Sequence, residues 1–185
     1  WEAQALAKRT NNKVVVVLID FEKAYDRVCC NFLESVMGKL GIHESWIKGT
    51  SGLYRNAISC VSLVGERGSF FQISRSVRQG CSLTPSLFLL YVDSALSSFL
   101  NSRHLNVCGL LVSHSHQSLL DIDFADDTVV HMQGDLENIK KLQSGLAMFC
   151  KTSNAMINWH KSCAIWLSRK AHPTWLPHPT FKWIN

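Results

Sequence analysis

The sequence has no long apolar run. A continuous stretch such as Val14–Ile19 falls far short of the roughly 20 residues that a helix needs to cross a bilayer. We therefore expect no membrane-spanning helix and no membrane partner. The first residues, Trp1–Gln4, also lack a basic region, an apolar stretch and an initiator Met, so they do not resemble a signal peptide and suggest a longer parent chain.

No C-x-x-C pair occurs, although the chain has seven cysteines. The count is odd, and Cys29 and Cys30 are adjacent, which is poor geometry for a disulfide. We therefore expect a reducing compartment, in which the thiols are either buried or incidental. The eight histidines include His114 and His116, but no Cys/His set has the spacing of a zinc site.

Charged residues make up 18% of the chain and hydrophobic residues 46%, which excludes a disordered class and favours one packed domain. The formal net charge is +5, with a pI of about 8.9. This mild basic bias permits a phosphate-bearing partner without requiring one.

Hydrophobic periodicity predicts mixed helices and strands. Helical spacing covers residues 32–40, 45–54, 87–100 and 136–149, and strand-like runs cover residues 14–19, 57–64, 70–74, 119–124, 128–131, 156–159 and 163–167. The order lacks a regular βαβ alternation. The predicted fold class is therefore α+β, an antiparallel sheet with helices packed mainly on one face.

Several local signals predict where elements begin and end. Gly41 fits the C′ position after a helix, and Asp135 fits an N-cap. Thr84 followed by Pro85 predicts a helix with a hydroxyl cap and proline at its first position. Three prolines and two tryptophans after His172 suggest a connector.

Acidic residues at strand ends carry the main chemical hypothesis. Asp20 ends a buried strand, and Asp126 and Asp127 occupy the tip of a predicted hairpin. Each has a plain alternative, a helix cap for the first and ordinary turn chemistry for the pair. If the strands are neighbours, however, the acids converge, and a few carboxylates with water and phosphate form the usual Mg²⁺ shell.

Four blocks in order resemble the reverse transcriptases of non-LTR (LINE-type) retrotransposons, most like those of plant elements. The resemblance covers roughly residues 1–168. The blocks are Val17–Val28 (VLIDFEKAYDRV), Val77–Pro85 (VRQGCSLTP), Phe124–Asp127 (FADD) and Ile157–Ser162 (INWHKS). The resemblance implies a polymerase palm with part of the fingers over residues 1–168, and a connector toward a thumb over residues 169–185.

The resemblance also implies catalytic and metal-binding roles. Asp20 and Asp126 would be the main ligands of two Mg²⁺ ions, with Mn²⁺ as an alternative, and Asp127 would lie nearby. The backbone carbonyl of Phe21 would reach the ion that carries the triphosphate. Lys161 would approach the pyrophosphate, although a single lysine at a strand end is more often a surface charge.

Substrate-binding roles follow in the same way. Tyr25 would exclude a ribose 2′-OH and so select dNTP, where its alternative is a core aromatic. Gln79 and Gly80 would lie under the incoming nucleotide and template base, since glycine allows close approach. Arg78 would orient that loop or contact phosphate, or else be a solvated charge. The partners implied are an RNA template, a DNA primer and dNTP. Action on chromosomal DNA, as in this family, allows a nuclear location, with the cytoplasm as the alternative, and secretion is not expected.

The sequence departs from the family pattern at Ser82, where proline is usual, and at Ser76, where glycine is common. In this family the fingers lie upstream of the first block and the thumb downstream. We therefore expect the isolated chain to have weak or no polymerase activity. The alternatives are a catalytically inactive retroelement remnant that at most binds nucleic acid weakly, and a two-metal hydrolase that uses the same acids.

Overall fold

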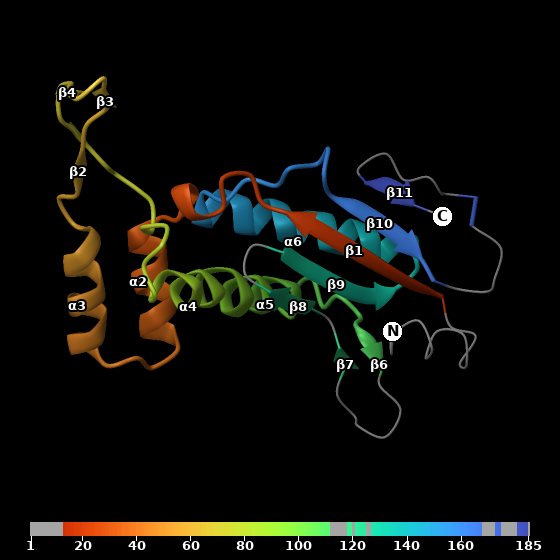
Figure 1. Ribbon diagram of the computed structural model, residues 1–185. Helices are drawn as coiled ribbons and strands as arrows, with labels where there is room; N and C mark the ends of the chain where they lie inside the picture. The colour runs from red at the N-terminus through yellow and green to blue at the C-terminus, as the bar shows by residue number, and fades with distance from the viewer. Residues whose placement is uncertain are drawn as a thin grey trace.

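The computed structural model describes residues 13–111, 118–119, 121–124, 127–167, 173–174 and 181–184. A five-stranded sheet lies at its centre, in the order β11-β10-β1-β9-β8 (Figure 1). Its pairs are antiparallel except β10 with β11, which is parallel. The strands are β1 (Val14–Asp20), β8 (Asp121–Phe124), β9 (Asp127–Gln133), β10 (Cys163–Trp166) and β11 (Lys182–Ile184).

Strand β1 holds the middle of the sheet because its β-branched residues can be buried on both sides. On one face Val15, Val17 and Ile19 belong to the main hydrophobic core. On the other face Val14 and Val16 are buried as well. Burial on both faces was predicted and is confirmed, with Leu18 at 36% exposure as the exception near the strand end.

Helices supply the rest of the core. They are α2 (Cys30–Lys39), α3 (Glu44–Tyr54), α4 (Thr84–Leu89), α5 (Ala95–Leu100) and α6 (Leu136–Ser153), and a π-helical turn, Leu90–Ser94, joins α4 to α5. The predicted apolar stripe of α6 is fully buried from Ile139 to Phe149. The fold is α+β with an antiparallel core sheet, as predicted. None of the helices described is both long and apolar enough to cross a membrane.

Two of the predicted helix boundaries are confirmed. Gly41 follows α2 with a φ of +77°, and the chain closes there with bonds from Ile42 N to Met37 O at 3.1 Å and from Gly41 N to Gly38 O at 3.1 Å. That pair of bonds is a Schellman motif. The Asp135 carboxylate caps α6 by accepting from Asn138 N at 2.8 Å.

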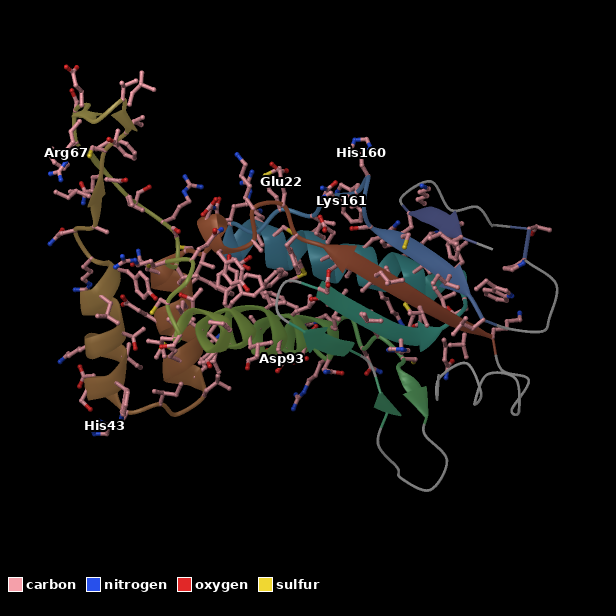
Figure 2. The ribbon with its side chains drawn as sticks, in the orientation of Figure 1. Glu22, His43, Arg67, Asp93, His160 and Lys161 are labelled. Carbon is pink, nitrogen blue, oxygen red and sulfur yellow. The ribbon has the colours of Figure 1, made fainter. Side chains whose placement is uncertain are left out.

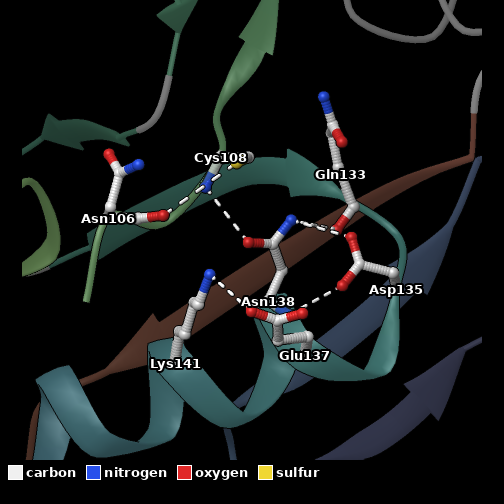
Figure 3. A network of polar contacts seen from close by, with 7 residues as sticks. All are labelled: Asn106, Cys108, Gln133, Asp135, Glu137, Asn138 and Lys141. Carbon is white, nitrogen blue, oxygen red and sulfur yellow. Dashed lines mark hydrogen bonds and ion pairs between the residues drawn. The ribbon is translucent and has the colours of Figure 1, made fainter. Parts of the chain in front are cut away.

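The cap of α6 also ties the helix to the sheet (Figure 3). The Asn138 amide donates to Asp135 Oδ2 at 2.9 Å and to the Gln133 carbonyl at 3.4 Å, and its oxygen accepts from Cys108 N at 3.1 Å. Asn138 is 3% exposed, and these partners satisfy its amide in the interior. The end of β9 and the start of α6 are therefore fixed together.

Three local predictions need correction. Thr84 does not cap its helix, because the N-cap is Leu83 and the Thr84 hydroxyl donates to the Arg78 carbonyl at 2.6 Å. Residues 156–159 do not form a strand, and a single bridge joins Ile157 to Phe21. The predicted strands 57–64 and 70–74 form a hairpin of two short ladders instead, in which β2 (Ile58–Ser59) pairs with β5 (Phe71–Gln72) and β3 (Ser62–Leu63) pairs with β4 (Glu66–Arg67).

The predicted division of the chain at residue 168 stays a prediction. Within the segment expected to be a connector, β11 pairs with β10 at Cys163–Lys182, Ala164–Trp183 and Ile165–Ile184. Phe181, just before β11, is buried and its ring lies 5.6 Å from that of Trp159. This part of the connector therefore packs against the sheet.

Candidate active site

Asp20 and Asp127 face each other across neighbouring strands. They are the last register pair of β1 and β9, so their side chains share one face of the sheet. The backbone of Asp20 bonds on the opposite side, since its N–H and carbonyl meet Ser162 and Asn158. The pair is therefore a non-hydrogen-bonded one, in which Cα atoms approach to about 4.5 Å and side chains lie closest.

This placement confirms that two of the three predicted acids converge. Asp20 is half-buried, Asp127 is exposed, and neither forms an ion pair with a residue that the structure describes. Two facing carboxylates without a basic partner repel each other, and a divalent cation with oxygen ligands would relieve that repulsion. Two carboxylates are a partial donor set for Mg²⁺, and the described residues contain no group of three or more His, Cys, Asp or Glu side chains that could hold a metal ion. Asp126 lies outside the described residues.

A loop holds the end of β1 in place. The β1–β10 ladder stops at Leu18–Cys163, and residues 158–162 then bulge beside residues 19–20 before the Phe21–Ile157 bridge. Within this loop the Asn158 backbone N–H donates to the Asp20 carbonyl at 2.8 Å, and the Ser162 hydroxyl accepts from Asp20 N at 3.1 Å. The Asp20 backbone is thus satisfied on both sides of its Cα.

The same loop presents Lys161. Its backbone N–H donates to the Asn158 carbonyl at 3.1 Å and lies 3.3 Å from Asn158 Oδ1, while the Ser162 hydroxyl donates to the Asn158 carbonyl at 2.9 Å. Ser162 is fully buried and Lys161 is exposed. Figure 2 shows Lys161 on the same edge of the molecule as Glu22, two residues after Asp20. The loop therefore fixes the backbone of Lys161 relative to that of Asp20.

An open cleft of about 820 Å³ gathers most of the predicted site residues. Those that line it are Asp20, Phe21, Tyr25, Gln79, Gly80 and Lys161. Asn158 and Thr84 also line it. The cleft joins the end of β1 to the loop before α4, two regions far apart in the sequence. A volume of this size is within the range of small-ligand sites, roughly 300–1,000 Å³.

The loop at Gln79 and Gly80 is fixed from both ends. Val77 N donates to the Tyr25 carbonyl at 3.0 Å, and the Thr84 hydroxyl holds the Arg78 carbonyl at 2.6 Å. Gly80 has a φ of +79°, and a Cβ built there would meet nothing within 4 Å. The backbone conformation, rather than crowding within the protein, is thus what favours glycine at this position.

Tyr25 stands at the wall of the cleft in a 3-10 turn, Tyr25–Arg27. Its ring is half-buried and lies 4.9 Å from the ring of Phe88 in α4. The ring thus packs in the interior while the residue also lines the cleft, and the expected role as a gate stays a prediction. Packing against Phe88 restricts where the ring can move.

Two further predicted residues, Phe21 and Arg78, do not place their side chains in the cleft. The Phe21 ring is 6% exposed and packs edge-on against Phe149 at 6.0 Å, so its backbone is the part that can serve the cleft. Arg78 lines a neighbouring hollow instead of the cleft. Arg27, next to Asp26, pairs with Glu22 at 3.4 Å.

Sequence reasoning missed the positioning residues Asn158, Ser162 and Thr84. Asn158 and Ser162 belong to the fourth block, in which only Lys161 was predicted to take part in the chemistry. A short polar residue on each side of a lysine is a weak signal, because Asn and Ser are also ordinary loop residues. Thr84 was interpreted as a helix cap, the commonest use of threonine before proline.

Replacing Ser162 by alanine should weaken metal binding without unfolding the chain. The Asp20 N–H would lose its acceptor, which costs about 1–3 kcal/mol of stability. Removing a residue that orients a metal ligand typically lowers metal affinity about 10–100-fold. We expect Mn²⁺ affinity, measured by electron paramagnetic resonance of free Mn²⁺, to fall by about tenfold.

Ser144→Ala is the matched control, since the Ser144 hydroxyl donates to the Lys140 carbonyl at 3.0 Å on the exposed side of α6. It removes one hydroxyl far from the Asp20 backbone. Equal Mn²⁺ affinity in the Ser162 variant and the control would contradict the positioning role.

Known proteins resemble this chain over nearly its whole length. Residues 2–183 match the family described as Reverse transcriptase (RNA-dependent DNA polymerase). A curated relative, the Transposon TX1 uncharacterized 149 kDa protein of Xenopus laevis, is 27% identical over 179 residues, which is 97% of this chain and 13% of that protein. The chain thus spans a small part of the relative. The predicted retrotransposon family is confirmed, and its plant-like character stays a prediction.

Solved structures share the fold. Telomerase from Candida albicans, in complex with the TWJ fragment of telomeric RNA, has a TM-score of 0.63 and 14% identity, over 93% of this chain and 29% of that one. Apo telomerase from Candida tropicalis, truncated from its C-terminal domain, has a TM-score of 0.62 and 15% identity, over 92% of this chain and 35% of that one. The chain belongs to the reverse transcriptase (RNA-dependent DNA polymerase) family.

Proposed function

We propose that this chain carries the catalytic core of a reverse transcriptase that joins a dNTP to a DNA primer on an RNA template. The observation that carries the proposal is the register pair Asp20–Asp127 beside a cleft lined by Tyr25, Gln79 and Lys161. In the reaction the primer 3′-OH attacks the α-phosphorus of the dNTP and pyrophosphate leaves. Two bound Mg²⁺ ions would activate the attacking hydroxyl and stabilise the charge on the leaving group.

The protein contributes positioning and charge. Asp20 and Asp127, with Asp126 as the third proposed carboxylate, would hold the ions, and the Phe21 carbonyl would complete the ligand set. Lys161 would place its cation against the pyrophosphate. Such transfers depend mainly on orientation and electrostatic stabilisation, with little covalent chemistry by the protein.

Gln79 and Gly80 would support the nascent base pair. Gly80 has no side chain and nothing of the protein within 4 Å of its Cβ position, so a base can approach the backbone. The palm would hold the A-form hybrid through its backbone and 2′-hydroxyls, which requires no base sequence.

Primer extension on an RNA template tests the proposal. The chain, alone and supplied with an upstream fingers segment, is incubated with a DNA primer, dNTPs and Mg²⁺ or Mn²⁺. Extension in the supplemented reaction supports the enzyme. No extension under any of these conditions would indicate an inactive remnant, and cleavage of nucleic acid without dNTP would indicate a hydrolase.

Replacing Tyr25 by alanine should relax sugar selection. If the ring occupies the space of a ribose 2′-OH, its clash with rNTP is of the size of other overpacking costs, about 1–3 kcal/mol. Discrimination between dNTP and rNTP, measured as the ratio of kcat/KM values, should therefore fall about ten- to a hundredfold. Tyr25→Phe keeps the ring and should keep the discrimination; an alanine variant that still rejects rNTP would contradict the gate.

A further inference from the structure

A second hollow, of about 460 Å³, is lined by residues that immediately precede a stretch of the cleft lining in the sequence. Its lining comes from the end of α3, from Cys30 in α2 and from residues 57–59 and 73–76, which open and close the hairpin. Figure 1 shows α2 beside α3. Arg78 completes it, and the next residues along the chain, Gln79 and Gly80, line the cleft. We call this second space the side hollow.

The side hollow is positively charged. Arg75 and Arg78 line it, and its described lining contains no Asp or Glu. Neither arginine forms an ion pair with a described residue. Glu34, on the neighbouring α2, is already engaged by Arg55 at 3.5 Å and by the Ser51 hydroxyl at 2.5 Å. The two guanidinium groups are therefore available to an anion from outside the protein.

Hydroxyl groups add neutral donors. Tyr54 is one of the residues that line the side hollow. Its hydroxyl is shielded from solvent and has no partner among the described residues. A buried hydroxyl without a partner costs about 1–3 kcal/mol, so a turn of the Tyr54 side chain that brought its hydroxyl to an acceptor in the side hollow would be favourable. Ser59 and Ser74 also line the space. Guanidinium and hydroxyl donors around one hollow suit the oxygens of a phosphate.

The backbone fixes how the arginines are presented. Ser76, between them, has a φ of +128°, and its N–H donates to the Val28 carbonyl at 3.1 Å. This conformation, rare for a residue with a side chain, turns the chain so that Val77 is fully buried while Arg75 and Arg78 stay exposed at the side hollow. The adjoining Val77 N–H holds the Tyr25 carbonyl at 3.0 Å.

We propose that the side hollow binds a backbone phosphate of the single-stranded RNA template next to the nucleotide that lies in the cleft. The proposal rests on the proposed function, since it assumes that a template passes Gln79 and Gly80. The volume accommodates a group of about one nucleotide and is too small for a duplex. Arg75 and Arg78 would keep the strand in line with the cleft.

Salt dependence of RNA binding tests the proposal on the chain itself. Binding of a fluorescent single-stranded oligouridine is measured by anisotropy at several salt concentrations. Each phosphate contact contributes about 0.7 to the slope of log K against log salt for single strands. The Arg75→Gln, Arg78→Gln double variant should lower that slope by about 0.7 if both arginines contact one phosphate, and Tyr54→Phe should weaken binding with the slope unchanged.

A charge-matched control removes the effect of net charge. Lys140 and Lys151 are exposed on α6, and changing both to Gln removes the same charge away from the side hollow. The control should keep the wild-type slope, and circular dichroism should show equal folding for both. Equal slopes in the two double variants, or no measurable RNA binding by the wild type, would overturn the proposal.

A second experiment distinguishes binding of the RNA template in the side hollow from binding of the triphosphate of a free nucleotide. Inorganic triphosphate is added as a competitor in the presence of EDTA, which removes metal-dependent binding in the cleft. Displacement of RNA from the wild type at low concentrations of triphosphate, but not from the double variant, would assign the side hollow to the nucleotide and overturn the template role. Loss of slope without primer extension would leave the RNA site standing and refute the proposed function, whereas extension with an unchanged slope would refute the side hollow alone.

Discussion

Replacing Asp20 by asparagine should lower the rate of primer extension by about three orders of magnitude. Asp20 opposes Asp127 at the end of β1, and asparagine keeps its size while removing the charge that is proposed to bind the ions. Metal catalysis supplies several kcal/mol of transition-state stabilisation, and a loss of ~4 kcal/mol corresponds to about a thousandfold. The rate is measured on the chain supplied with a fingers segment, so that the wild type provides a reference.

Thermal unfolding gives the same prediction a readout that needs no activity. In EDTA the variant should be at least as stable as the wild type, because one of two facing carboxylates no longer repels the other. Added Mn²⁺ stabilises a protein that binds it when folded, by about 2.7 kcal/mol at a hundred times the Kd. The wild type should gain that stability and the Asp20→Asn variant should gain far less.

Asp93→Asn is the matched control. Asp93 is an exposed carboxylate in the π-helical turn and lies on the opposite edge of the molecule from Lys161 in Figure 2. It should change neither the rate nor the response to Mn²⁺. An Asp20→Asn variant that behaves like this control would mean that the two facing acids do not form a metal site.

The elements that the sequence predicted best are those whose pattern reports burial directly. Strand β1 is a short run of mostly β-branched residues that is almost entirely buried. Such a run favours a strand buried on both faces over a helix or a loop. Helix α6 combines a capping Asp135 with a buried stripe of regular spacing, so that local and global preferences agree. The meeting of Asp20 with Asp127 followed from placing both at strand ends of one sheet.

The parts that escaped prediction depend on partners that the local pattern does not specify, some of them distant in the sequence. Ser162 holds Asp20 across 142 residues, and nothing near Ser162 indicates that its hydroxyl replaces a ladder bond. Thr84 had a local role available as a cap, but the Arg78 carbonyl competes for its hydroxyl in the folded chain. The pairing of β11 with β10 is likewise a contact that the hydrophobic pattern alone does not specify.

The side hollow shows how a departure from a family pattern can still serve the site. Ser76 occupies a position where glycine is common, and its φ of +128° explains why glycine would be favoured there. The serine adopts the same conformation, because the Val28 carbonyl holds its N–H and the buried Val77 fixes the next residue. Serine therefore supports the conformation that presents Arg75 and Arg78 at the side hollow.

The second large effect concerns Phe149, which links the helices to the strand end that carries the acids. It is fully buried in α6. Its ring centroid lies 6.0 Å from those of Phe21 and Tyr91, 6.2 Å from that of Phe99 and 6.3 Å from that of Phe32. Phe21 immediately follows Asp20, so the packing of this ring cluster also sets where Asp20 and the Phe21 carbonyl, the proposed metal ligands, lie.

Replacing Phe149 by alanine should destabilise the fold by ~4 kcal/mol, the middle of the range for a buried Phe truncated to Ala. For a chain of 185 residues each kcal/mol lowers Tm by about 2–4 °C, which gives a fall of roughly 8–16 °C. Calorimetry measures the shift. Folded Phe149→Ala at low temperature should also bind Mn²⁺ more weakly, since the Phe21 backbone loses its support.

Two further variants keep this result interpretable. Met148→Ala changes the neighbouring residue of α6, which is 49% exposed, and should lower Tm by no more than a few degrees. Phe149→Leu fills much of the space without a ring and should recover a large part of the stability. If it recovers Tm but not Mn²⁺ affinity, ring packing against Phe21 positions the metal ligands; a Phe149→Ala variant as stable as Met148→Ala would show that this ring does not hold the core.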